Sequence, residues 1–262
     1  MSMSGDKLQF YYMNCKRYFL ELRTKGFDYW FSAFFSALKA RDGWILDVGC
    51  GVGQVVNKLS ENGFSALGVD ISPIGTRMAT KQGSGAFVVA SAACLPFQDC
   101  SFASVGFHDF LEHTSYPKTC LSEMVRVLRN GGKIVAMAPN FLRVIGLSQE
   151  YHWHMRGPHR KISNLLNLIR KTALSRLSPR AMRFDFMLPQ LDIEGAGGDT
   201  DAICVTNPID IRFHLRKLNV GIIAQSAAPG HPEGIVEKLG RLPIVRSMSS
   251  STFLVGRKCD SH

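Results

Sequence analysis

The chain has 262 residues, of which 45% are hydrophobic and 20% charged, so it is neither disordered nor of low complexity. This length suits one large α/β domain with an elaboration. The most apolar run, Tyr29 to Leu38, is about half as long as a membrane span needs to be. Seven cysteines without metal-binding spacing indicate reduced thiols, and we expect a cytoplasmic protein without a signal peptide.

The net charge of +10 is distributed unevenly. Residues 1–41 carry +4 and residues 141–190 carry +7, whereas residues 42–140 carry −1 and residues 191–262 carry no net charge. A basic block favours an anionic partner or surface, and the alternative is a solvated face that aids solubility.

Short apolar runs alternate with helix-like stretches between Trp44 and Asn140, which predicts repeated β-α units and a parallel sheet. Proline at the start of a helix and glycine after its end mark several boundaries. The expected strands are Trp44–Val48, Ala66–Val69, Ala86–Ala90, Phe102–Phe107 and Lys133–Ala138, and the expected helices are Gln54–Asn62, Pro73–Gln82 and Pro117–Arg129, the last stopped by Gly131 and Gly132.

The alternation breaks after Asn140 and resumes at Asn207 with a helix and two strands, Val220–Ala227 and Ser251–Arg257. We therefore expect an α/β fold with a seven-stranded, mostly parallel, doubly wound sheet. Its four parts are an N-terminal helical extension or lid (1–41, with one or two aromatic-rich helices), a core (42–140), a basic cap insertion after strand five on the substrate side (141–206), and the remainder of the α/β core (207–262).

The most informative segment runs from Asp47 to Gly53. A buried strand ends at an acid, and glycines follow at alternate positions ahead of a helix. Glycine has no Cβ, so the backbone there can turn tightly and lie against a ligand. Asp70 ends the next strand, where a carboxylate can accept hydrogen bonds from a ribose diol.

Two cofactors suit this arrangement. A dinucleotide needs the spacing G-x-G-x-x-G, whereas the third glycine here, Gly53, comes one position early. Asp47 is awkward beside a pyrophosphate but useful beside the ammonium group of an amino acid. The pattern therefore favours S-adenosylmethionine (SAM) over a nicotinamide cofactor.

The sequence resembles the class I, Rossmann-like SAM-dependent methyltransferases. Five segments match that family in order and spacing, over about residues 42–140, and residues 207–258 match loosely. The segments are Leu46 to Gly53, Gly68 to Ser72, Leu95 to Phe97, Phe110 to His113 and Val125 to Gly132.

The resemblance implies roles for individual residues. Glycines would pass under the carboxypropyl chain of SAM, Asp47 would orient its amino end, Asp70 would bind the ribose and Ile71 would lie against the adenine. Ser91 stands where the family usually has an acid. The expected cofactor-binding residues are Asp47, Gly49, Cys50, Gly51, Gly53, Asp70, Ile71, Ser91, Ala92, Phe107 and His108.

The acceptor side is less defined. Methyl transfer needs the acceptor held in line with the methyl group, and it needs a base only where the acceptor is protonated at neutral pH. The expected bases are His108, which ends strand four and is the better placed, and His113, His152 and His154; for His113 the alternative is a structural contact at the next helix. The expected substrate residues are Tyr11, Tyr12, Trp153, Arg156 and Arg160, the arginines for an anionic group; for residues 151–160 a simple structured loop is the alternative.

Residues 161–178 predict a basic amphipathic helix. Such a helix can lie peripherally on an anionic membrane surface, or its apolar side can pack on the domain as a lid. The apolar stripe consists of Ile162, Leu165, Leu166, Ile169, Ala173 and Leu177.

These patterns predict a SAM-dependent methyltransferase whose acceptor is a small molecule or a lipid- or saccharide-linked group, at O, N or C. No cysteine or acid completes a metal site beside the histidines, so we expect no metal. Few aromatic residues interleave the basic block, so we expect no nucleic acid. The alternatives are a nucleic-acid methyltransferase and a non-catalytic module that binds SAM or lipid.

Overall fold

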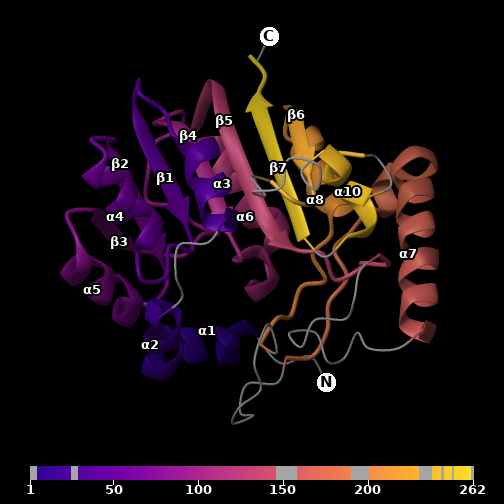
Figure 1. The fold of residues 1–262 in the computed structure, drawn as a ribbon, viewed down its shortest axis with the longest axis horizontal. Helices are drawn as coiled ribbons and strands as arrows, with labels where there is room; N and C mark the ends of the chain where they lie inside the picture. The colour runs from indigo at the N-terminus through magenta and orange to yellow at the C-terminus, as the bar shows by residue number, and fades with distance from the viewer. Residues whose placement is uncertain are drawn as a thin grey trace.

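The computed structural model describes residues 5–24, 29–145, 158–189, 201–229, 238–242, 245–249 and 251–260. A seven-stranded sheet in the order β3-β2-β1-β4-β5-β7-β6 forms its centre (Figure 1). The predicted seven-stranded, mostly parallel sheet is thereby confirmed. The strands are β1 (Trp44–Val48), β2 (Ala66–Asp70), β3 (Ala86–Val89), β4 (Phe102–His108), β5 (Leu128–Pro139), β6 (Val220–Ser226) and β7 (Ser251–Lys258).

The strands β1 to β5 are parallel, and β7 runs antiparallel to both β5 and β6. The carboxyl ends of β1, β2 and β4 consequently meet at one edge of the sheet, which is where open α/β sheets bind ligands. The helices are α1 (Gly5–Asn14), α2 (Lys16–Thr24), α3 (Tyr29–Leu38), α4 (Gln54–Glu61), α5 (Pro73–Gln82), α6 (Pro117–Val127), α7 (Pro158–Leu177), α8 (Pro208–Lys217) and α10 (Val245–Met248), with short 3₁₀ turns η1 (Leu111–His113) and η3 (Pro179–Ala181).

Both faces of the sheet are covered by helices. On one face α3 and α4 bury Phe34, Leu38 and Val56 against β1 and β5. On the other face α6 and α8 bury Leu121 and Leu215 in a larger core that includes β4 and β7 residues. The apolar run Tyr29–Leu38 is therefore a helix packed on the sheet.

Local sequence fixes several helix starts. The Ser72 side chain accepts a hydrogen bond from the backbone N–H of Gly75 at 3.2 Å, and Pro73 takes the first helical position of α5. The Asn207 side chain caps α8 in the same way, accepting from the N–H groups of Ile209 and Asp210. These caps place α5 and α8 where the sequence predicted them.

Two boundaries differ from prediction. The N-terminal extension holds three helices, α1 to α3, in place of one or two. The helix expected to run to Arg129 ends at Val127, because the fully buried Leu128 pairs with Phe102 and already belongs to β5. The glycine pair therefore lies within a strand, with Gly131 at φ 69° beside a register shift of the β4–β5 ladder.

Helix α7 packs against α8 with a polar face. Its buried residues are Asn164, Leu168 and Lys171. The Asn164 amide donates to the carbonyls of Phe141 and Arg143, and the Lys171 ammonium lies 2.6 Å from the Asp210 carboxylate. Of the two alternatives for the apolar stripe, packing on the domain is therefore not the one observed, because these polar contacts, with Leu168 and Leu174, form the inward face of the helix.

The described helices include none that is long and apolar enough to cross a bilayer.

We expect the buried Lys171–Asp210 pair to be a major determinant of stability. Lys171 is 1% exposed and Asp210 is fully buried, so Lys171→Met leaves a buried carboxylate without its cation. Removing one partner of such a pair costs about 3–5 kcal/mol of the free energy of unfolding, measured by urea denaturation.

Arg170→Met is the matched control. Its half-exposed guanidinium lies 3.1 Å from Asp185, and Asp185 keeps its contact with the Lys171 ammonium at 3.0 Å in this variant, so the loss should cost less than about 1 kcal/mol. Equal losses in the two variants would contradict the assignment.

Candidate functional site

The loop between β1 and α4 has a backbone that only glycine adopts easily. Gly49, Gly51 and Gly53 have φ angles of 74°, 52° and 73°. A Cβ on Gly49 would lie 2.5 Å from the Phe110 ring, and one on Gly53 would lie 2.5 Å from the Phe87 ring. At Gly51 a Cβ would meet Leu22 of α2 at 3.4 Å and, its chain neighbours apart, no other atom of the described residues within 4 Å. Gly51 is thus the glycine whose open side is free for a ligand.

Asp47 places a carboxyl group directly beneath this loop. The residue is 4% exposed, and among the described residues no donor is hydrogen-bonded to its side chain. Burial, and secondarily the charge of Asp70, raises the pKa of Asp47 to about 8. A buried carboxyl group without a donor fits a cationic ligand group such as an ammonium.

Asp70 joins the two loops at the ends of β1 and β2. Its Oδ2 accepts from the Gly51 N–H at 2.9 Å and its Oδ1 accepts from the Ser72 N–H at 2.8 Å. Burial raises its pKa, and the hydrogen bonds from these backbone amides oppose the rise. Each oxygen keeps a lone pair for a further donor, as a ribose diol would supply.

The other predicted cofactor-binding residues differ in how far they are buried and in what they contact. Cys50 lies in the same loop, and burial raises the pKa of its thiol well above the usual value, so the thiol is neutral. Ser91 is exposed and accepts from the Ala93 N–H, whereas Ala92 is buried in the core. Ile71 packs against Tyr12.

Phe107 and His108 do not line the crevice as predicted. Phe107 is fully buried in the main core. The His108 imidazole stacks on Phe31 of α3 with ring centroids 4.5 Å apart, and Phe34 covers it edge-on. Alternation along β4 turns this histidine to the face that α3 covers, where its Nδ1 lies 3.6 Å from Asp109 Oδ2.

A hydrogen-bonded cluster joins three distant segments beside the crevice. The Tyr12 hydroxyl of α1 donates to Asp201 Oδ2 at 2.7 Å and lies 2.8 Å from His113 Nδ1. Tyr12 and Asp201 are buried, and the His113 side chain is 11% exposed. The charge of His113 also lowers the pKa of Asp70, so the cluster is close to the cofactor loops.

The sequence did not single out Asp201. Its only signal was its position at the end of the Gly/Asp-rich stretch before the α/β pattern resumes. Tyr11, a predicted substrate residue, packs edge-on against Tyr12 with ring centroids 5.3 Å apart.

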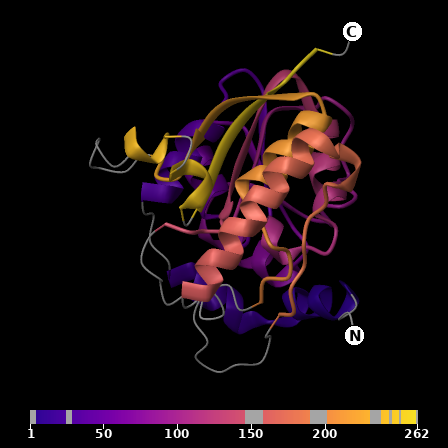
Figure 2. The same cartoon turned by 90° about the vertical axis from the view of Figure 1, so that its right-hand side faces the viewer.

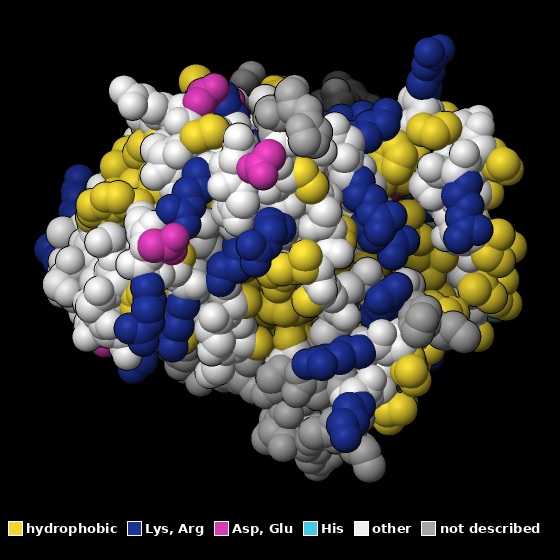
Figure 3. All heavy atoms as spheres, turned by 90° about the horizontal axis from the view of Figure 1, so that it is seen from above, with side chains coloured by type: hydrophobic (Ala, Val, Ile, Leu, Met, Phe, Trp, Pro, Cys, Tyr) yellow, Lys and Arg dark blue, Asp and Glu magenta, His cyan; other side chains and the backbone are white. Residues whose placement is uncertain are grey.

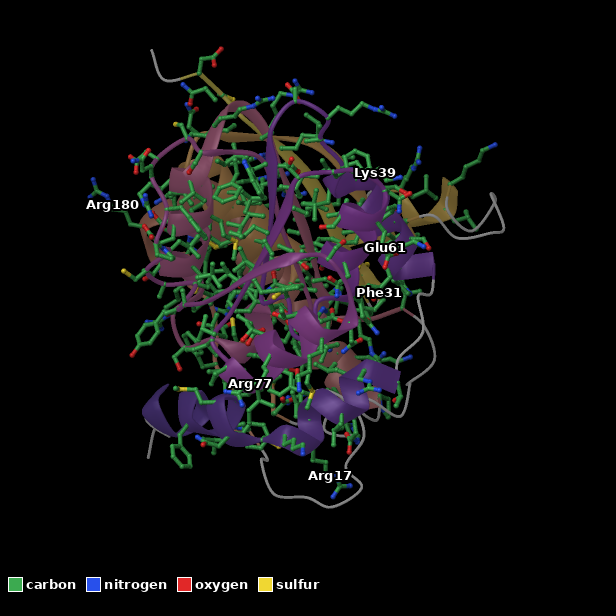
Figure 4. All side chains as sticks on the ribbon, turned by 90° about the vertical axis from the view of Figure 1, so that its left-hand side faces the viewer. Arg17, Phe31, Lys39, Glu61, Arg77 and Arg180 are labelled. Carbon is green, nitrogen blue, oxygen red and sulfur yellow. The ribbon has the colours of Figure 1, made fainter. Side chains whose placement is uncertain are left out.

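The helices α1 and α2 lie along the edge of the sheet at which β1 and β2 end (Figure 1). In Figure 4 the labelled Arg17 points from α2 away from the sheet, and the labelled Arg77 lies on the sheet side of these helices. Leu22 of α2 and Tyr12 of α1 therefore face the loops that hold Gly51 and Ile71.

The remaining predicted residues do not join this cluster. Arg160 is exposed in the first turn of α7. His152, Trp153, His154 and Arg156 lie outside the described residues. In the part of the chain that is described, no group of three or more His, Cys, Asp or Glu side chains could hold a metal ion.

The described geometry fits SAM. Asp47 would take the ammonium group, the open side of Gly51 would take the amino-acid chain, and Asp70 would take the ribose hydroxyls. Each of these groups is present and has unfilled hydrogen-bonding capacity or space.

Comparison with known proteins agrees with this site. Residues 46–136 match the methyltransferase domain family. A ubiquinone biosynthesis O-methyltransferase from Idiomarina loihiensis is 26% identical over 57% of this chain and 70% of its own length. A demethylmenaquinone methyltransferase from Renibacterium salmoninarum is 33% identical over 35% of this chain and 39% of its own length.

Coverage of these relatives is partial. The protein MJ1252 of Methanocaldococcus jannaschii is 30% identical, and the match spans about half of each chain, 48% in both cases.

Solved structures share the fold over nearly the whole chain. A structure from a Haloferax volcanii complex between the Trm112 methyltransferase activator and a methyltransferase has a TM-score of 0.61 at 15% identity, covering 97% of this chain and 99% of that one. The [4+2]-cyclase SpnF has a TM-score of 0.55 at 15% identity, covering 88% of this chain and 80% of its own. The Haloferax complex contains a protein partner, whereas the sequence predicted only a small-molecule one. Residues 46–136 thus match a methyltransferase domain, and the chain shares the seven-stranded fold of solved methyltransferase structures.

Proposed function

We propose that this chain transfers the methyl group of SAM to a hydroxyl group of a small aromatic acceptor, such as a phenol or hydroquinone. The observation that carries the cofactor assignment is the buried Asp47 carboxyl group, which has no donor among the described residues and lies beneath Gly51. When bound, SAM supplies an electrophilic methyl group on its sulfonium.

Two features support an aromatic hydroxyl as acceptor. The relatives include proteins named for ubiquinone biosynthesis and for demethylmenaquinone. Beside the crevice, Tyr11, Tyr12 and Tyr18 pack edge-on against one another, which gives an aromatic surface. A phenol is protonated at neutral pH, so its methylation needs a base.

The hydrogen bonds of the cluster support His113 as that base. Because the Tyr12 hydroxyl donates to Asp201, its oxygen accepts from His113 Nδ1. In the neutral imidazole Nε2 then carries no hydrogen and has a lone pair. Burial, and after it the charge of Asp201, raises the pKa of Tyr12 well above 10, so its hydroxyl stays protonated and holds this tautomer.

The proton path follows from this tautomer. As the acceptor oxygen bonds to the methyl group, its proton passes to His113 Nε2. Asp201 Oδ2 lies 3.6 Å from His113 Nδ1 and Glu112 Oε1 lies 3.8 Å from His113 Nε2, so two carboxylates stabilise the imidazolium. His113, Tyr12 and Asp201 thus act as base and positioning residues.

A second candidate is a SAM-binding protein that does not transfer the methyl group. The fold is shared with a protein named as a [4+2]-cyclase, so fold alone does not decide the reaction. Formation of S-adenosylhomocysteine from SAM in the presence of phenols and hydroquinones, followed by mass spectrometry, separates the two.

We expect Asp70→Ala to weaken the binding of both SAM and S-adenosylhomocysteine. Loss of hydrogen bonds to a charged acceptor costs roughly 1.5–3 kcal/mol, which corresponds to about ten- to a hundredfold in the calorimetric Kd. Asp99→Ala, which removes an exposed carboxylate paired with Arg126, is the control and should leave Kd unchanged. A folded Asp70→Ala protein with unchanged affinity would overturn the site.

Asp47 should link SAM binding to proton release. Its pKa is about 8 without ligand, so it is largely protonated at pH 7, and an adjacent ammonium lowers that pKa. Binding near pH 7 should therefore release close to one proton, and the calorimetric enthalpy should differ between phosphate and Tris buffers. In Asp47→Asn the binding enthalpy should be the same in both buffers. Equal enthalpies for the native chain in the two buffers would contradict proton release from Asp47.

The same pKa predicts how the free protein responds to pH. The folded state holds the Asp47 proton more tightly than the unfolded chain, so stability falls as pH rises from about 4 to about 8. In thermal unfolding, Asp47→Asn should gain stability over the native chain across this window, with the largest gain near pH 8. A constant difference across the window would show that Asp47 is not the titrating group.

Substitutions of His108 and His113, the two predicted bases that the structure describes, should have opposite effects on kcat. His113→Asn should lower kcat by about 10² to 10⁴ with SAM affinity within a few-fold of native, because only proton transfer is lost. Tyr12→Phe should also lower kcat and shift the pH–rate profile, because the tautomer is no longer held. His108→Asn should keep its kcat; the reverse pattern would make His108 the base.

A further inference from the structure

The outward face of α7 is apolar. We call Ile162, Leu165, Leu166, Ile169, Ala173 and Leu177 the outer stripe; its large side chains range from 38% exposed at Leu165 to 84% at Leu177. With 3.6 residues per turn, the stripe lies about 160° around the helix from the buried Asn164, Leu168 and Lys171. Its orientation is therefore fixed by the contacts on the opposite side.

The outer stripe is continuous and lies on the outside of the molecule. Figure 2 shows α7 crossing the front of the molecule with α8 behind it. In Figure 3 hydrophobic side chains gather along the right-hand edge, the side that α7 occupies in Figure 1. A contiguous exposed apolar surface marks an interaction site more often than a single exposed leucine does.

Four arginines adjoin one end of the outer stripe. We call Arg176 of α7, Arg212 and Arg216 of α8 and Arg246 of α10 the arginine cluster. Helix α8 packs against both α7 and α10, which brings these side chains together. Burial, and then the charges of Arg216, Arg246 and Arg176, lowers the pKa of Arg212.

The charge of the arginine cluster is not neutralised locally. Among the described residues no acidic side chain forms an ion pair with any of its four members. The Nε of Arg246 is buried without a hydrogen-bond partner. Residues 158–189 add to the imbalance, with seven basic side chains and one acidic one.

We propose that the outer stripe and the arginine cluster together bind the surface of an anionic lipid bilayer. The aliphatic side chains would enter the boundary between headgroups and acyl chains, and the arginines would contact lipid phosphates. A helix with one apolar side and flanking cations has the features of an interfacial helix, and anionic headgroups attract basic residues near a membrane. No described helix spans a bilayer, so the contact is peripheral.

Charge argues against a second copy of the chain as the occupant. Two copies that met through this surface would bring two arginine clusters together, in a protein whose net charge is already +10. A bilayer that contains anionic lipid supplies the opposite charge and an apolar layer at once.

Flotation with vesicles tests the proposal without using the methyl-transfer activity. We expect the native chain to bind phosphatidylcholine vesicles that contain phosphatidylglycerol at least tenfold more tightly than vesicles of phosphatidylcholine alone. Added salt should weaken the binding, because exposed charges are screened.

Two pairs of variants separate the apolar and the charged parts. Ile162→Glu with Leu166→Glu should lower binding at least tenfold, whereas Val89→Glu, at a 50% exposed site on the opposite edge strand β3, should not. Arg176→Gln with Arg216→Gln should remove most of the preference for phosphatidylglycerol. Arg77→Gln with Lys81→Gln, which removes two exposed cations from α5, should keep it. Thermal unfolding checks that every variant is folded.

Three outcomes would overturn the proposal. The native chain could fail to bind phosphatidylglycerol vesicles even at low salt. The glutamate pair could bind as tightly as the native chain. Light scattering could show a native dimer that the glutamate pair dissociates, which would make this face an interface between copies.

Discussion

The carboxylate of Asp70 is the contact on which the site depends. By accepting from the N–H groups of Gly51 and Ser72, it ties the loop after β1 to the start of α5 and fixes the width of the crevice between them. The glycine backbone can reach this carboxylate because Gly49, Gly51 and Gly53 all adopt positive φ. Asp47 is held below the same loop, so two carboxyl groups share one buried region, and burial together with the charge of Asp70 raises the pKa of Asp47.

The acceptor side is built from segments that are far apart in the chain. Tyr12 and Asp201 are 189 residues apart in sequence, and the Tyr12 hydroxyl contacts both the Asp201 carboxylate and the His113 imidazole. This cluster attaches the N-terminal helices to the core and brings the His113 imidazole near Asp70. In the proposed function, the core domain would provide the cofactor loops, while the additions to it would provide the groups that select and activate an acceptor.

A second buried polar contact sets the character of the surface. The Lys171–Asp210 pair and the Asn164 amide face the domain, so the aliphatic residues of α7 face outward. Burying a lysine is unfavourable unless it is paired, and Asp210, Asp185 and the Arg183 carbonyl supply the partners. The polar contacts therefore decide which side of an amphipathic helix is exposed.

The sequence by itself determined the sheet and the cofactor loop, because these depend on local signals: apolar strands of fixed length, caps at Ser72 and Asn207, and glycines at alternate positions. It could not determine the acceptor cluster or the orientation of α7. His108 ends strand four and His113 follows it in the η1 turn; only the tertiary structure shows that His108 stacks on Phe31 of α3 while His113 contacts Tyr12 and Asp201. Helical periodicity marks two faces of α7, but the choice between them depended on Asp210, 39 residues beyond Lys171, whose buried charge drew the lysine inward.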